Sequence, residues 1–328
     1  MAKKAGCYSG IGGQAVLEGV MMKNQDQYAV AVRKPNGEIE VKREEFQGTV
    51  SGRKWKKLPF IRGVFNFVDS MILGTKTLNY SASFYDDEEE AKTEEQAEKQ
   101  KKSDQILIAC TTVFAVVLSV GIFVVLPYFL SSLLGKYIRN NSLIAIIEGL
   151  IRIAIFLLYV WGISAMKDIK RLYQYHGAEH KCINCIERGR ELTVPNVMRS
   201  SRFHKRCGTS FLVFVMLVSV VLFFFIRVDS VVLRVVLRVA LMPVVAGISY
   251  EIIRLAGRVD NVFINLLSAP GFWIQHLTTS EPDESMVEVA IASVEAVFDW
   301  KKYLKDTFDY TPSDDTDEKE EDAESSEV

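Results

Sequence analysis

The sequence predicts a polytopic α-helical membrane protein with about four transmembrane helices and a small α+β cytoplasmic portion that includes an N-terminal β-hairpin. Two observations lead to this fold class. Long apolar runs alternate with almost wholly polar segments in the 328 residues, and basic residues collect between the runs rather than within them. A single soluble domain would mix its apolar and polar residues, so we exclude that class. Five scattered cysteines also exclude a secreted disulfide scaffold.

The membrane domain is predicted over residues 105–253, because a spanning helix needs about 20 mostly apolar residues. Four segments meet this need: 106–134, 143–166, 210–226 and 231–253. The first and third contain no charge, and Pro127 is expected to kink the first. The second contains Glu148 and Arg152, and the fourth contains Arg234 and Arg238.

The distribution of basic residues predicts how the helices are oriented. Residues 167–209 hold ten Lys and Arg, whereas the connections at 135–142 and 227–230 are short and nearly neutral. By the positive-inside tendency, both termini and the 167–209 loop are expected to lie in the cytoplasm. The chain start has no apolar stretch typical of a signal peptide. The expected partner is the lipid bilayer, with no nucleic acid.

The N-terminal region, residues 1–82, is predicted to be cytoplasmic. Two alternating runs within 28–46 flank Pro35-Asn36-Gly37, which predicts a β-hairpin. The glycines of 10–22 permit a tight turn, but no Lys-Ser/Thr follows, which disfavours a phosphate-binding loop. Residues 60–82 form an amphipathic helix, for which two alternatives stay open: it lies in the membrane interface, or it packs on the core.

Two acidic segments separate or follow the folded regions. Residues 83–104 and 311–328 carry nine acids each, so we predict a charged linker and a disordered tail. A cytoplasmic helical region is predicted over 254–310, between the membrane domain and the acidic tail.

The 167–209 loop carries the residues that suggest chemistry. His176 and His180 are one helical turn apart, and Glu179 lies on nearly the same face. Two imidazoles at this spacing can hold one transition metal, and a neighbouring carboxylate can accept a proton as the general base.

A second group in the same loop extends the predicted site. His204 and Cys207 complete a tetrahedral set of four metal ligands with the two histidines, and zinc is the expected divalent metal. Cys182 and Cys185 form a Cys-x-x-Cys pair that would extend this set or act as a redox couple. Glu251 is an additional carboxylate candidate. Arg152, paired with Glu148, is a separate candidate for contact with substrate or lipid.

Several motifs resemble the YqhQ-like family of bacterial membrane proteins of unknown function. They are GGQAVLEGVMM at 12–22, the helix at 62–82, YHGAEHK at 175–181, RFHKRCGTS at 202–210 and the segment 270–291. Members of that family are described as predicted metal-dependent enzymes. The resemblance implies that His176, Glu179, His180, His204 and Cys207 match the polar motifs of the family.

We therefore expect a metal-dependent membrane enzyme, a hydrolase acting on a peptide or lipid at the cytoplasmic membrane face. One alternative is a non-catalytic scaffold or membrane-protein assembly factor with a structural metal site. A transporter, suggested by Arg152 and Glu148, is the other alternative.

Overall fold

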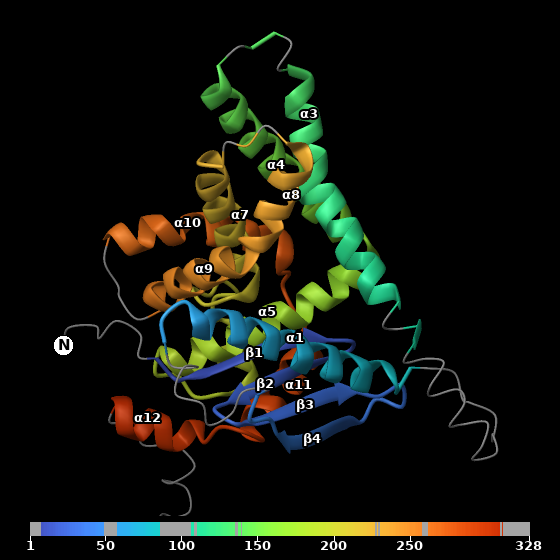
Figure 1. Cartoon of the computed structure of the whole chain (residues 1–328). Coiled ribbons are helices and arrows are strands. Elements are labelled where there is room, and N and C mark those ends of the chain that lie inside the picture. Colours follow the sequence, from blue (N-terminus) through green and yellow to red (C-terminus); the bar gives the residue numbers. More distant parts are fainter. Residues whose placement is uncertain are drawn as a thin grey trace, which may run out of the picture.

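The structure is a computed structural model. It describes residues 8–48, 58–85, 106–107, 110–134, 137–138, 140–226, 228, 230–257, 262–308 and 310. The predicted tail at 311–328, and the predicted linker beyond residue 85, lie outside the described residues. A sheet with its covering helices forms one end of the molecule, and apolar helices rise from it to form the other end (Figure 1).

The N-terminal region forms a four-stranded antiparallel meander. Its strands, in the order β1-β2-β3-β4, are β1 (Ile11–Val16), β2 (Gly19–Asn24), β3 (Gln27–Arg33) and β4 (Ile39–Glu45). The predicted hairpin is β3–β4, and Gly37 in its turn has a φ of 89°, which favours glycine. The glycine-containing segment 10–22 is also a hairpin, because Ala15 pairs with Val20.

Both faces of this sheet are covered, which explains why successive residues in the middle of its central strands are apolar. Successive side chains point to opposite faces of a strand. Val20 and Met22 join the core beneath α5 (Lys167–Glu187) and α11 (Glu284–Glu295). Met21 and Val30 join the core beneath α1 (Ile61–Ala82). The sheet therefore forms the middle layer of three, with α1 on one side and α5 and α11 on the other.

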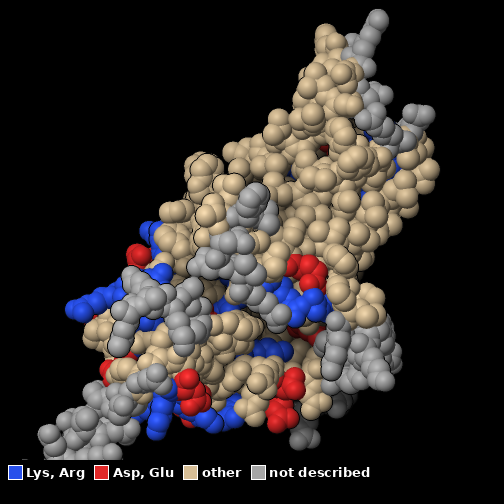
Figure 2. All heavy atoms as spheres, turned by 90° about the vertical axis from the view of Figure 1, so that its left-hand side faces the viewer, with Lys and Arg blue, Asp and Glu red and all other residues tan. Residues whose placement is uncertain are grey.

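Within the described chain, three helical stretches are long and apolar enough to cross a membrane. They are Cys110–Leu134, Ser142–Ser164 and Val232–Ala256. The first ends in η2 (Gly121–Val125) and α3 (Leu126–Leu134), the second is α4 (Asn141–Ser164), and the third comprises α8 (Val231–Ala240) and α9 (Met242–Ala256). The predicted segment 210–226 forms α7 (Gly208–Phe224), an apolar helix of 17 residues that is shorter than these three stretches. Figure 2 shows the charged side chains gathered at the sheet end, while the opposite end is almost free of them.

Pro127 removes one backbone hydrogen bond from the first of these stretches. Proline has no N–H to donate to the carbonyl four residues earlier, which is that of Phe123. The preceding turn, η2, is a π-helix, and Arg152 Nε donates to the Phe123 carbonyl at 2.9 Å. The carbonyl that proline leaves without a helical partner is thereby satisfied by α4.

The apolar face of α1 does not pack on the sheet. Phe67, Val68, Met71 and Ile72 are exposed. The helix instead contacts its neighbours through a second face of small and polar residues around Leu73, namely Gly63, Asp69, Gly74, Thr77 and Ser81. This arrangement favours the membrane-interface alternative for α1.

The remaining helices are α6 (Val194–Met198), α10 (Val262–Thr278) and α12 (Trp300–Phe308). α10 packs against α7 and α9, whereas α6 and α11 belong to the sheet end.

Candidate metal centre

α5 carries the two histidines of the candidate site on one unbroken helix. A glycine in the helix interior normally weakens it, yet α5 continues through Gly177. A Cβ at Gly177 would lie 2.1 Å from the backbone oxygen of Ser280. The glycine therefore lets the chain that follows α10 lie directly against α5.

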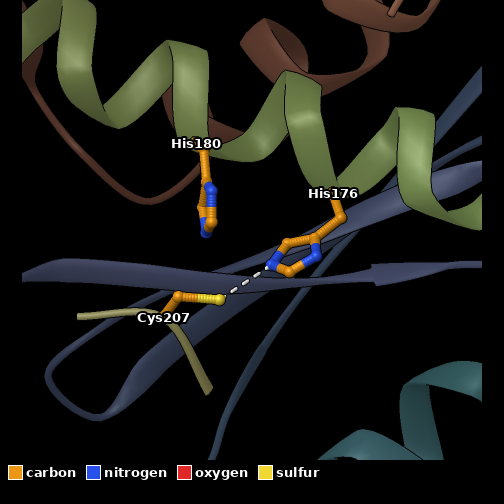
Figure 3. Close-up of side chains that lie close together, drawn as sticks. All are labelled: His176, His180 and Cys207. Atoms are coloured by element: carbon orange, nitrogen blue, oxygen red, sulfur yellow. Dashed lines mark hydrogen bonds between the residues drawn. The ribbon is translucent and has the colours of Figure 1, made fainter. Parts of the chain in front are cut away.

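His176, His180 and Cys207 converge from two remote segments. Their ligand atoms all lie within 4.8 Å of one another. His176 Nε2 is 3.2 Å from Cys207 Sγ, and the two imidazole centroids are 4.4 Å apart. Figure 3 shows both rings descending from α5 toward the sulfur. In the described part of the chain, this is the one group of three or more His, Cys, Asp or Glu residues with such geometry.

Backbone carbonyls fix the orientation of both rings. The Nδ1 atoms of His176 and His180 lie 2.8 Å and 2.6 Å from the carbonyl oxygens of Thr278 and Arg202. With Nδ1 donating its proton to a carbonyl, each Nε2 is left as the free nitrogen of the neutral ring. Histidine ligands in metal sites are usually held by this kind of bond.

Cys207 occupies the N-terminus of α7. Its sulfur accepts the backbone N–H of Thr209 at 3.4 Å and lies 3.0 Å from the Thr209 hydroxyl. Burial alone would raise the pKa of Cys207, but the adjacent His176 and His180 hold it well below its usual value. Burial likewise opposes the charge of His176, yet the neighbouring Cys207 raises the pKa of His176 to about 9. Each group therefore stabilises the charged form of the other, and a metal bound at His176 Nε2 would take the place of the proton on that nitrogen.

Glu179 lies at the edge of this group. The side chain is buried, and Oε2 is 3.5 Å from His180 Nε2. A Cβ at Gly13 of β1 would lie 2.9 Å from Glu179 Cγ. The glycine in β1 thus makes the space that this carboxylate occupies.

His204 lies next to the group but faces away from it. Its ring centroid is 5.6 Å from that of His180, and its Nε2 is 3.5 Å from Glu187 Oε2. Burial opposes the charge of Glu187, but the bond from His204 and the charge of Arg206 lower the pKa of Glu187 to about 2. The structure therefore brings together three of the four predicted ligands and places His204 in an adjacent ion-paired cluster.

The other predicted residues lie elsewhere. Cys182 and Cys185 are buried in the core between the sheet and α11, and burial raises the pKa of Cys185 to about 11. Glu251 accepts from Arg62 Nε at 2.7 Å and links α9 to α1. Arg152 is buried in the apolar end, where its Nη2 donates to Glu148 at 2.8 Å.

The residues that hold the site in place carry little or no signal in the sequence. Thr278 and Arg202 act through carbonyl oxygens, which every residue has, so their identity gives no signal. Gln275 is fully buried, and it accepts the N–H and donates to the carbonyl of His204. The sequence offers only the position of Gln275 in the mostly apolar segment 262–278 as a sign of this role.

Comparison with known proteins gives the family of the chain. The family model described as "Protein of unknown function (DUF1385)" matches residues 58–300. The chain belongs to this family. It is 40% identical over 286 residues to the uncharacterized protein YqhQ of Bacillus subtilis (strain 168). The matched region covers 86% of this chain and 90% of that protein. No solved structure matches the chain. The predicted family resemblance is confirmed, and all three converging residues of the site lie within the DUF1385 match.

Proposed function

We propose that the chain is a membrane protein with one zinc ion bound by His176 Nε2, His180 Nε2 and Cys207 Sγ. One observation carries this proposal. Two imidazoles on one helix are each oriented by a backbone carbonyl toward a thiolate that lies 31 residues away from His176. Imidazole nitrogen and thiolate sulfur are ligands that zinc prefers.

The ligand set supports a catalytic role more than a structural one. Structural zinc sites usually have four protein ligands, whereas catalytic sites have three and an open position. A bound zinc ion supplies Lewis acidity that polarises a carbonyl or phosphoryl group. The Glu179 carboxylate, 3.5 Å from His180 Nε2, is close enough to accept a proton from an attacking water. The activity we infer is hydrolysis of a peptide or lipid at the membrane surface.

We also propose the cytoplasmic membrane of a bacterium as the location, with both termini and the zinc site in the cytoplasm. The ten basic residues of 167–209 support this orientation.

Metal analysis of the purified protein tests the ligand set. We expect about one zinc per wild-type chain, and almost none in His180→Ala or Cys207→Ala. His276→Ala is the matched control, because His276 is exposed and stacks on Phe203 at 4.5 Å between ring centroids. Wild-type protein that purifies from zinc-containing medium without zinc would refute the proposal.

The variant Glu179→Gln separates an enzyme from a scaffold. An enzyme should keep its zinc and lose activity in a screen of ester, amide and phosphodiester substrates in vesicles. If Glu179→Gln retains full activity in such a screen, or if wild-type protein hydrolyses nothing while His180→Ala unfolds, the scaffold alternative is favoured.

A second candidate function is favoured by the position of Cys207. A cysteine at a helix N-terminus, 3.2 Å from a histidine nitrogen, has the arrangement of a nucleophilic thiol with its base. Zinc-free protein that still hydrolyses a substrate, and loses this activity after alkylation of Cys207, would favour the thiol mechanism over the zinc mechanism.

A further inference from the structure

α1 exposes a broad apolar face that the described residues cover only in part. Its exposed apolar side chains are Ile61, Phe67, Val68, Met71, Ile72 and Leu78. At 100° per residue they occupy an arc of about 140°. Met71 is 55% exposed, although it is a large apolar residue in a folded region. These residues share one face, interrupted by Thr75 and Asn79, and such a grouping marks a contact surface rather than a scatter of single exposed residues.

α10 has a narrower stripe of the same kind. Val262, Leu266 and Trp273 are 83%, 72% and 80% exposed. Their spacing puts them within about 40° of one another around the helix. The opposite side of α10 is buried, and it includes Gln275 and Ser268. α10 is therefore anchored along one side and presents apolar residues on the other.

Both helices lie against the ends of α7 and α9 nearest the sheet. A Cβ at Gly63 of α1 would lie 2.6 Å from Tyr250, and Phe67 of α1 stacks on Phe211 of α7 with centroids 5.4 Å apart. A Cβ at Gly271 of α10 would lie 2.7 Å from Ser210 Oγ at the start of α7. Figure 1 shows α1 and α10 running across the picture while α3 rises steeply.

We propose that α1 and α10 lie in the plane of the membrane, with their apolar faces inserted in the leaflet nearest the sheet. Two observations favour lipid over a protein partner as the occupant. The exposed faces adjoin helices that themselves expose large apolar residues, such as Val244 and Leu255 of α9. The α10 stripe ends in Trp273 and the exposed His276, and tryptophan is enriched at membrane interfaces. An in-plane helix with an apolar face buried in the acyl boundary is an established form of membrane attachment.

This placement puts α10 between the lipid and the candidate metal centre. The carbonyl of Thr278, in its last turn, holds His176, and Gln275 holds the backbone of His204. The site would then lie directly beneath the leaflet.

Quenching of single tryptophans by brominated lipids tests the placement. The chain has four tryptophans, and each would be retained alone, with the other three changed to phenylalanine. In vesicles of phosphatidylcholine brominated at the acyl chain, Trp273 should lose as large a fraction of its fluorescence as Trp161, which is 64% exposed on α4. Trp300, 9% exposed in the sheet end, should be unaffected.

A matched pair of variants tests α1 in the tryptophan-free protein. Met71→Trp should be quenched by the brominated lipid, whereas Ser70→Trp should not, because Ser70 is exposed but lies about 100° away around the helix. Circular dichroism and zinc content check that each variant is folded.

Two results would overturn the proposal. Trp273 and Met71→Trp quenched by aqueous acrylamide and not by lipid would indicate faces open to water, available to a protein partner. Lipid quenching that rises as the protein is diluted in the bilayer would indicate faces covered by a second copy of the chain.

Discussion

Two buried polar clusters occupy opposite ends of the molecule, and they differ in how their polar atoms are satisfied. The histidine–cysteine cluster comprises His176, His180 and Cys207 at the sheet end. The charge cluster comprises Glu148, Arg152 and Arg238 in the apolar end, and each of the three is at most 5% exposed. Both would attract attention in a sequence, because buried polar residues require partners.

The charge cluster is paired mostly among its own members, although Arg238 Nε has no hydrogen-bond partner among the described residues. Glu148 accepts from Arg152 Nη2 at 2.8 Å and from Arg238 Nη2 at 2.9 Å, and Arg152 also donates to the Phe123 carbonyl. In the histidine–cysteine cluster, carbonyls engage the outer ring nitrogens while both Nε2 atoms and a sulfur converge. Ring nitrogens and a sulfur that converge on one place therefore indicate a site, whereas burial of charge alone does not. Through these bonds Arg152 and Glu148 join α4, α8 and the π turn.

The largest expected loss of unfolding free energy comes from removing the carboxylate of the charge cluster. Glu148→Ala leaves two buried guanidinium groups without their counter-ion, and we expect it to cost about 3–5 kcal/mol of unfolding free energy. Equilibrium unfolding in mixed micelles measures this loss. The control is Glu251→Ala, which breaks the partly exposed pair with Arg62 and should cost about 1 kcal/mol or less. A similar loss for both variants would mean that the charge cluster is hydrated and open, and the transporter alternative would regain support.

Metal removal tests the opposite property in the histidine–cysteine cluster. A ligand that binds only the folded state stabilises it by about 2.7 kcal/mol at 100 times its Kd and about 4.1 kcal/mol at 1,000 times. Chelation of the wild-type protein should lower its unfolding free energy by an amount in this range. In His180→Ala the chelator should have no effect, because the ligand set is incomplete. A wild-type unfolding curve that the chelator leaves unchanged would contradict a bound metal.

Acid should weaken the cluster of His204, Glu187 and Arg206 that borders the candidate site. The pKa of Glu187 is about 2 in the folded protein, against an ordinary value of 4.5. A carboxyl with a lowered folded pKa adds stability that is complete above pH 4.5 and is lost as the pH falls toward 2. The full loss would be about 3 kcal/mol. Unfolding measured between pH 5 and pH 3 should show this slope in the wild type and a shallower one in Glu187→Gln; equal slopes would contradict the assignment.

The sequence predicts the features that depend on neighbouring residues better than those that depend on contacts between remote residues. Apolar runs define membrane helices by composition alone, and the Pro35-Asn36-Gly37 turn defines the β3–β4 hairpin locally. The pairing of β1 with β2 was missed because the glycines of 10–22 resemble a loop. One of those glycines, Gly13, lies close to Met21 and Met22 of the paired strand and also to Glu179, which is 166 residues away and gives no local signal.

The sequence predicts which residue types form the candidate site, but it does not predict which way each side chain points. The i, i+4 spacing of His176 and His180 on a helix does bring their rings together. The pattern could not tell that Cys207 turns toward them while His204, three residues earlier, turns toward Glu187. That choice depends on Gln275 and Thr278, which belong to α10 and share no motif with the histidines.

The smallest expected effect concerns the Cys-x-x-Cys pair, whose spacing suggests metal ligands. Cys182 and Cys185 are both fully buried in the core, and Cys185 Sγ donates to the carbonyl of Glu191 at 3.2 Å. Cys182→Ala should leave the zinc content unchanged and cost about 1 kcal/mol, since it removes one buried sulfur from a packed core. Cys207→Ala, a change of the same size in the candidate site, should abolish zinc binding. Loss of zinc in Cys182→Ala would show that the core cysteines take part in the metal centre. Cys182 and Cys185 would then no longer differ in role from Cys207.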